Sequence, residues 1–197
     1  MSAALAVLLK APRMGTVKTR LASEIGARQA LRLYRVMVAR TLASVGEASL
    51  EVTVWFTPSE AAAEVRFWLG AAWDLRPQAS GDLGARLFAA EQAVARGRPW
   101  IAIGVDCPRL TGELLQEAVG IIRRGSVVLG PATDGGYYLI GGTTPLPGLF
   151  SDMPWGTDRV LSETRARLKR AGARWQELPE LRDVDTAEAA RAEGLLT

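Results

Sequence analysis

Short apolar runs and amphipathic segments alternate along most of the 197-residue sequence. The apolar runs are short and rich in branched and aromatic residues, which is typical of buried strands. They predict strands over residues 3–9, 50–56, 74–76, 100–105, 127–129, 137–140 and 174–177. Segments with apolar residues three and four positions apart predict helices over residues 27–44, 59–69, 82–95, 111–124, 157–171 and 186–193.

Several of the expected helices begin with a residue that can accept a hydrogen bond from the first turn. Ser59, Asp82 and Thr111 stand at such positions. Asp185 is followed three residues later by Glu188, a spacing typical of a helix cap. The sequence therefore predicts an N-cap at each of these four residues.

Strands that alternate with helices predict an α/β fold whose sheet is mostly parallel and covered on both faces. The link between the strands at 127–129 and 137–140 is too short for a crossover helix. We therefore expect a mixed sheet with an antiparallel strand at this point. The length suits one core, and no repeat or linker divides the chain, so we expect a single domain over residues 1–197.

Composition narrows the class of protein and its surroundings. Hydrophobic residues make up 48% of the chain and charged residues 23%, as in an ordinary globular protein. No apolar run is long enough to span a membrane, and no charged segment precedes a hydrophobic one at the start, so we expect a cytoplasmic protein. The net charge of +3 is spread over helices, which does not favour a nucleic-acid or membrane partner.

The sequence holds one cysteine, Cys107, and no histidine. This excludes an internal disulfide, a Ser-His or Cys-His nucleophile and a histidine-bound zinc ion. A metal ion would have to be a hard cation held by carboxylates, such as Mg²⁺ or Mn²⁺. We expect Cys107 to fill space in the core.

A basic loop follows the first predicted strand directly. It carries Arg13, Gly15, Lys18 and Arg20 within residues 10–21, and no acidic residue lies close to them in the sequence. Backbone N–H groups and cations in such a loop are suited to a polyanion such as the phosphates of a nucleotide. Its position at the carboxyl end of a strand, where α/β sheets bind ligands, favours this role over a merely solvated loop.

Acidic residues stand after later elements. Asp106 ends a buried strand, where an Asp is as often a turn former as a ligand. Thr111 is already available as the next helix cap, so Asp106 is free to face the basic loop. Asp183 and Asp185 would share one face of an extended segment and could both reach a metal ion, although Asp185 also fits a cap.

Two glycine-containing segments are further candidates. Gly135 and Gly136 either allow close approach to a ligand or form an ordinary turn, and Asp134 beside them could bind a hydroxyl group of an acceptor or sugar. Gly81 precedes a helix in which Arg86 lies one turn from the start, and both could contact phosphates or a base. Trp155 is the tryptophan that we expect to line a pocket.

Five motifs occur in order along nearly the whole chain: KAPRMGTVKTRL at 10–21, GDLG at 81–84, GVDCPRL at 104–110, GPATDGGY at 130–137 and DVDT at 183–186. Together they resemble a bacterial family of glycosyltransferase-like proteins related to 2-phospholactate guanylyltransferase. The resemblance implies the nucleotide-diphospho-sugar transferase (GT-A) fold, a Rossmann-like three-layer α/β/α sandwich. The chain departs from related nucleotidyltransferases in lacking their run of glycines directly after the first strand.

The resemblance also implies roles for individual residues. The loop residues Gly15, Lys18 and Arg20 would hold phosphates, with Arg13 at the edge of the loop. Asp106 would be the first ligand of Mg²⁺ or Mn²⁺. Asp185 would be the second metal ligand, with Asp183 as its substitute.

Three functions are compatible with these residues. The first is nucleotidyl transfer from a nucleoside triphosphate to a small phosphate- or phosphonate-bearing acceptor, with Lys18, Arg20 and the metal ion stabilising charge; the density of the basic loop favours it. The second is glycosyl transfer from a nucleoside-diphosphate sugar, with Asp134 as base. The third is a nucleotide-binding module without turnover. The base, the acceptor and any homo-oligomeric state are not indicated by the sequence.

Overall fold

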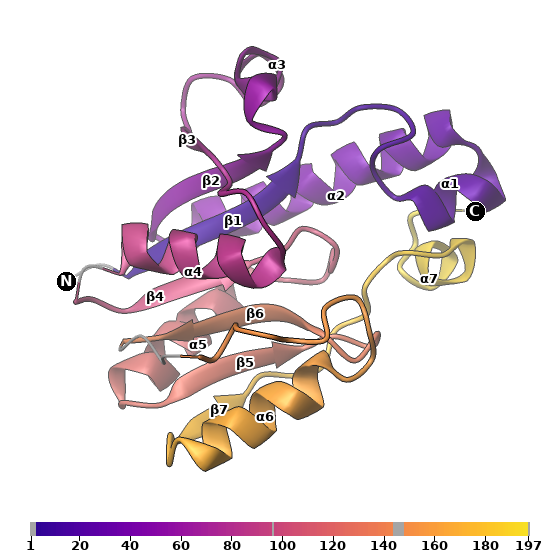
Figure 1. The fold of residues 1–197 in the computed structure, drawn as a ribbon. Coiled ribbons are helices and arrows are strands. Elements are labelled where there is room, and N and C mark those ends of the chain that lie inside the picture. The colour runs from indigo at the N-terminus through magenta and orange to yellow at the C-terminus, as the bar shows by residue number, and fades with distance from the viewer. Residues whose placement is uncertain (1–2, 96, 144–147, 197) are drawn as a thin grey trace.

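The computed structural model describes residues 3–95, 97–143 and 148–196, and seven strands form one sheet within them (Figure 1). The strands are β1 (Ala4–Lys10), β2 (Glu51–Thr57), β3 (Asp74–Pro77), β4 (Trp100–Ile103), β5 (Val127–Pro131), β6 (Tyr137–Gly142) and β7 (Trp175–Glu177). The helices are α1 (Thr19–Ile25), α2 (Ala27–Glu47), α3 (Ala62–Leu69), α4 (Leu83–Val94), α5 (Gly112–Arg123), α6 (Val160–Arg170) and α7 (Ala187–Ala192). A 3₁₀ turn (Ser59–Ala61) precedes α3.

The order of the strands in the sheet is β3-β2-β1-β4-β6-β5-β7. The pairs of β1 with β2 and β4, of β2 with β3 and of β5 with β7 are parallel. Strand β6 is antiparallel to both of its neighbours, β4 and β5. The predicted mixed, mostly parallel sheet is confirmed, including the reversed strand after the short link.

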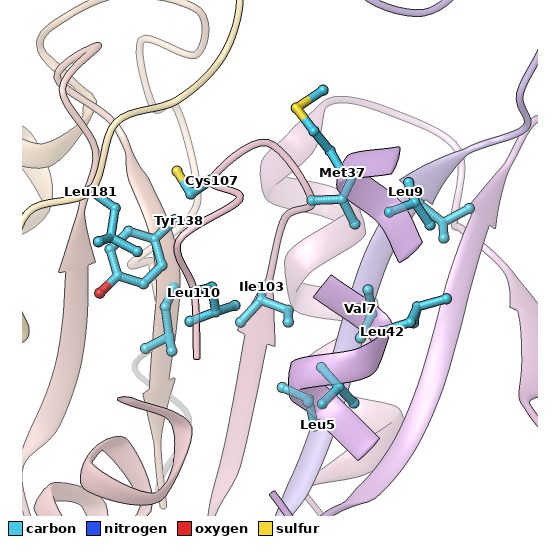
Figure 2. Packing of buried hydrophobic residues seen from close by; sticks show 14 of the residues in the cluster. Leu5, Val7, Leu9, Met37, Leu42, Ile103, Cys107, Leu110, Tyr138 and Leu181 are labelled. Atoms are coloured by element: carbon cyan, nitrogen blue, oxygen red, sulfur yellow. The ribbon is translucent and has the colours of Figure 1, made fainter. Parts of the chain in front are cut away.

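Helices cover both faces of the sheet, in three layers. The side chains of β1 alternate between the two faces of the sheet, because successive residues of a strand point to opposite faces. Leu5, Val7 and Leu9 belong to a core cluster that includes residues of α2 and α5. Figure 2 shows Met37 and Leu42 of α2 beside them. Ala4 and Ala6 pack on the other face with residues of α4 and α6.

Three of the helices have the side-chain caps that satisfy their free N–H groups. Asp82 accepts from the amide of Ala85 and Thr111 accepts from that of Leu114, as predicted. Two cap predictions are wrong. Ser59 makes no capping hydrogen bond, because the chain enters a 3₁₀ turn there. The cap of α7 is Thr186 rather than Asp185.

One helix is not predicted by the sequence pattern. The short helix α1 has seven residues, about two turns, so Leu21 and Ile25 give only one helical spacing. It lies directly after the basic loop, and α7 packs against it. Within the described parts of the chain, no helix combines the length and apolar character needed to cross a membrane.

Candidate active site

The basic loop begins where β1 ends, and a tyrosine fixes that end. The hydroxyl of Tyr34 in α2 accepts a hydrogen bond from the amide of Lys10 and donates one to its carbonyl, both at 2.8 Å. Burial raises the pKa of Tyr34, so the hydroxyl keeps its proton. The last residue of β1 is thereby held to the helix that packs beneath it.

The loop itself is a compact turn. Gly15 has a φ of 79°, a conformation that favours glycine, and the hydroxyl of Thr16 donates to the carbonyl of Arg13 at 2.9 Å. Val17 is buried and anchors the loop in the core. The loop therefore presents a defined path of backbone from β1 to α1.

The cations of this loop have different surroundings. Arg13 is paired with Glu64 at 2.8 Å and Glu60 at 3.2 Å, so acids distant in sequence neutralise it. Arg20 is exposed, and its guanidinium has no partner among the described residues. Arg20 is therefore available to a ligand, whereas Arg13 would first have to leave its two glutamates.

Lys18 is the buried cation of the loop, and it contacts two of the predicted acids. Its ammonium nitrogen Nζ lies 2.6 Å from Oδ1 of Asp106 and 2.7 Å from Oδ1 of Asp185. The side chain of Lys18 is 4% exposed, whereas those of Asp106 and Asp185 are 51% and 41% exposed. The basic loop, the end of β4 and the C-terminal segment thus meet at one point.

The charge of Lys18 is maintained by these partners. Burial alone would lower its pKa, but the negative charges of Asp106 and Asp185 outweigh that effect and raise it. Lys18 is therefore protonated at neutral pH. Because the two carboxylates are half exposed, water solvates the sides that do not face the ammonium.

Backbone and side-chain bonds bring the C-terminal segment to this point. The amide of Val184 donates to the carbonyl of Asp106 at 3.0 Å. Glu24 of α1 accepts from the amide of Ala187, at the start of α7, also at 3.0 Å. Thr186 caps α7, which leaves the carboxylate of Asp185 free to pair with Lys18. Asp185 is therefore positioned by contacts on both sides of it.

Asp183 faces a different neighbour. Its Oδ1 accepts from the hydroxyl of Thr133 at 3.0 Å. Burial and the nearby charge of Asp134 raise its pKa. Within the described residues no three acidic or thiol side chains form a group that could hold a metal ion. Of the three predicted metal ligands, the structure brings Asp106 and Asp185 together on one atom, and Asp183 lies with Thr133.

The turn between β5 and β6 carries the glycine pair. Asp134 is exposed and accepts from the amide of Gly136 at 2.8 Å. Gly135 has a φ of 82°, and a Cβ there would lie 2.3 Å from the carbonyl oxygen of Asp158. The absence of a side chain at Gly135 makes room for Asp158, which favours the turn-forming alternative for this residue.

The segment before α4 is tied to the ends of two strands by Gln78. Its amide nitrogen donates to the carbonyls of Leu9 and Trp55, each at 2.9 Å. Its amide oxygen accepts from Arg86 at 3.4 Å, and Arg86 also donates to the carbonyl of Gly81 at 3.1 Å. Gly81 has a φ of 103°, which only glycine adopts readily. Arg86 thus fixes the turn that carries Gly81.

The second glycine of the GDLG motif has a packing role. A Cβ at Gly84 would lie 2.3 Å from the carbonyl oxygen of Phe150 and 3.0 Å from Nε1 of Trp155. The half-buried Trp155 stands edge-on to Tyr137, with ring centroids 6.3 Å apart. Trp155 therefore packs against α4 and β6; that it also lines a pocket stays a prediction.

Cys107 lies in the loop that joins β4 to α5, and its side chain belongs to the hydrophobic core (Figure 2). It is 5% exposed. Burial and the neighbouring carboxylates raise the pKa of its thiol, so the reactive thiolate is suppressed. The predicted role of Cys107 as a space-filling residue is confirmed.

The donor set at Lys18 fits a hard divalent cation. Asp106 and Asp185 supply oxygen atoms that both lie within 2.7 Å of a single position, and both side chains are open to solvent. Mg²⁺ and Mn²⁺ prefer oxygen ligands, and Mg²⁺ is commonly held by one or two carboxylates together with substrate phosphates. The ammonium of Lys18 stands between these oxygens.

Three residues that take part in this arrangement were not singled out by the sequence. Glu24, Tyr34 and Gln78 hold α7, β1 and the segment before α4, respectively. Their partners are mostly backbone atoms from other elements. No sequence pattern records such a contact. The one available signal was at Tyr34, because its place on the apolar face of a predicted helix indicates a buried hydroxyl that needs a hydrogen-bond partner.

The fold is that of the nucleotide-diphospho-sugar transferases. A crystal structure from Desulfovibrio desulfuricans G20, provisionally described as such a transferase, has a TM-score of 0.88 and 32% identity; the match covers 94% of this chain and 84% of that one. A nucleotidyl transferase from Methanothermobacter thermautotrophicus has a TM-score of 0.63 and 16% identity. The match covers 96% of this chain and 95% of that one. Rv0371c from Mycobacterium tuberculosis H37Rv, in complex with manganese, has a TM-score of 0.62 and 18% identity. The match covers 100% of this chain and 98% of that one.

Residues 41–157 match the family described as "Uncharacterized protein conserved in bacteria (DUF2064)". This chain belongs to that family. It has no match among curated proteins.

Proposed function

We propose that this protein is a nucleotidyltransferase that depends on Mg²⁺ or Mn²⁺. It would transfer a nucleoside monophosphate from a nucleoside triphosphate to a small acceptor that carries a phosphate or phosphonate. An oxygen of the acceptor attacks the α-phosphorus, the bond from that phosphorus to the bridging oxygen breaks, and pyrophosphate leaves. The observation that carries the proposal is the contact of Lys18 with both Asp106 and Asp185.

The reaction needs positioning and charge neutralisation and does not need a nucleophile on the protein. Arg20 is exposed in α1, two residues after Lys18, and would add a second cation for the phosphates, with Gly15 allowing the loop to turn around them. A divalent cation on Asp106 and Asp185 would supply further positive charge to the phosphates. The fold matches a nucleotidyl transferase and a manganese-bound protein, which supports the proposal.

A pyrophosphate-release assay tests this function. Each of the four nucleoside triphosphates is combined with Mg²⁺ or Mn²⁺ and a panel of phosphorylated and phosphonylated acceptors. We expect release with at least one combination. We also expect Lys18→Met and Asp106→Asn each to reduce the rate about 10²–10³-fold, the usual effect of losing one charge-stabilising group.

Two matched variants serve as controls. Lys169→Met removes an exposed lysine of α6 whose side chain makes no hydrogen bond or ion pair among the described residues. Asp74→Asn removes a carboxylate of β3 that is 50% exposed and paired with Arg76, much as Asp106 is 51% exposed and paired with Lys18. Both controls should retain the rate of the natural chain. Equal losses in controls and site variants would contradict the assignment of the site.

Glycosyl transfer is the second candidate, because the relative at 32% identity is described as a nucleotide-diphospho-sugar transferase. The exposed carboxylate of Asp134 would then remove the proton of an acceptor hydroxyl. Hydrolysis of a nucleoside-diphosphate sugar without pyrophosphate release, abolished by Asp134→Asn, would favour this candidate over the first. Nucleotide binding without turnover of either donor class would leave a non-catalytic binding module.

A further inference from the structure

The ammonium of Lys18 stands where the proposed cation would bind. Its Nζ contacts the Oδ1 atoms of Asp106 and Asp185 at 2.6 Å and 2.7 Å. These distances are those of charge-assisted hydrogen bonds, so the ammonium occupies the space between the oxygens. A divalent ion that bound both oxygens from the same side would need that space.

The backbone keeps Lys18 at this position. Its φ and ψ are both 49°, a left-handed conformation, and it directly precedes α1. Val17 before it and Leu21 after it are buried in the core. Only the four-carbon side chain is free to turn, and such a stem lets the ammonium exchange one set of anionic partners for another.

A cation that approaches the pair alone would meet an adverse field. The side chain of Lys18 is 4% exposed, so little water screens its charge from an ion placed beside it. The two carboxylates are already neutralised in part by the ammonium. A polyphosphate changes this balance, because its oxygens offer the ammonium new partners and bring further negative charge to the site.

We infer that Lys18 excludes a divalent cation from the Asp106–Asp185 pair until a polyphosphate ligand draws its ammonium away. The cation and the polyphosphate therefore bind cooperatively, and each raises the affinity of the protein for the other. The inference rests on the cation site of the proposed function but on no particular reaction. It makes the charged nucleotide, rather than the metal ion alone, the species that opens the site.

Equilibrium dialysis with Mn²⁺ alone tests the exclusion. The natural chain and the control Lys169→Met should retain little Mn²⁺, whereas Lys18→Met should bind one ion at least about tenfold more tightly, because a unit positive charge beside the site is gone. Lys18→Met combined with Asp106→Asn should lose this binding again. Thermal unfolding of each variant checks that it is folded, and Lys18→Gln serves as a second variant.

A second dialysis measures the cooperativity with inorganic triphosphate as the probe. Mn²⁺ should increase retention of triphosphate by the natural chain, and the increase should shrink in folded Lys18→Met. Mn²⁺ binding to the natural chain alone, as tight as to Lys18→Met, would overturn the inference and leave the proposed function intact. No Mn²⁺ binding by folded Lys18→Met or Lys18→Gln would overturn both the inference and the cation site.

Discussion

Lys18 and Glu91 both have buried ionisable side chains, and the surroundings of the two differ. Lys18 lies beyond the carboxyl end of β1, between Asp106 and Asp185, and its side chain is 4% exposed. Glu91 lies on the inner side of α4, among residues such as Leu87 and Val94, and is 2% exposed. Both side chains are shielded from solvent. Of the two, only Lys18 has charged partners among the described residues.

The difference appears in their pKa values. Two carboxylates raise the pKa of Lys18 against the effect of burial, so the charge is retained. Burial alone raises the pKa of Glu91 to about 7, so this carboxyl is half neutral near physiological pH. The comparison shows that a buried charge persists where partners compensate it and is otherwise given up. The compensated charge is also the one at the candidate site.

The largest expected effect comes from removing the compensation at Lys18. The double variant Asp106→Asn/Asp185→Asn leaves a buried ammonium without an opposite charge. We expect it to lower the free energy of unfolding by about 3–4 kcal/mol, the usual cost of an uncompensated buried charge. Urea unfolding measures this loss.

The single variant Lys18→Met provides the matched comparison. It leaves two carboxylates that are 51% and 41% exposed and can be solvated by water. We expect a loss of about 1 kcal/mol or less from this change. Equal losses in the two experiments would show that the ammonium gains nothing from its partners.

The second effect concerns Glu91 and depends on pH. The unfolded chain ionises this carboxyl near pH 4.5 and the folded chain near pH 7, so the unfolded state binds fewer protons between these values. Stability therefore falls as pH rises through this window. The substitution Glu91→Gln removes the titration, and it should stabilise the protein by about 2–3 kcal/mol at pH 8 relative to its effect at pH 4.

Urea unfolding of both chains across this pH range measures the difference. Because other groups titrate equally in the two chains, their contribution cancels in the comparison. A difference that does not change with pH would show that Glu91 is ionised in the folded protein. It would also mean that a partner or water compensates the charge, as at Lys18.

The smallest expected effect concerns the N-cap of α7, which is Thr186, the residue after Asp185. Thr186→Ala removes the cap of α7 and should cost about 1 kcal/mol. Ser59→Ala, at a position where the sequence predicts a cap but the structure has none, should change stability by less than about 0.5 kcal/mol. Similar costs for the two variants would contradict the assignment of the caps.

Much of the fold could be predicted because its signals are local. The strands of the sheet show as short apolar runs, and the reversed direction of β6 followed from a link too short for a helix. Helix α1 escaped prediction because its seven residues offer only the single helical spacing of Leu21 and Ile25. Asp185 and Thr186 are both common caps, and sequence alone does not decide between adjacent candidates.

The candidate site was predictable only in part. The carboxyl ends of parallel strands lie at one edge of a sheet, so the nearness of Lys18 and Asp106 could be expected from β1 and β4. The pairing of Arg13 with Glu64 depends on where α3 packs, and the contact of Glu24 with Ala187 joins residues 163 positions apart. Such contacts are set by tertiary packing and leave no local pattern.

The reversed direction of β6 has a consequence for how the protein could diversify. Because β5 runs toward the site and β6 away from it, the turn that carries Asp134 is a hairpin tip at the same edge as Lys18. A hairpin tip can lengthen or shorten without disturbing strand register. Under the proposed function, insertions at this tip would alter the choice of acceptor in relatives, while the charges contributed by the parallel strands stay in place.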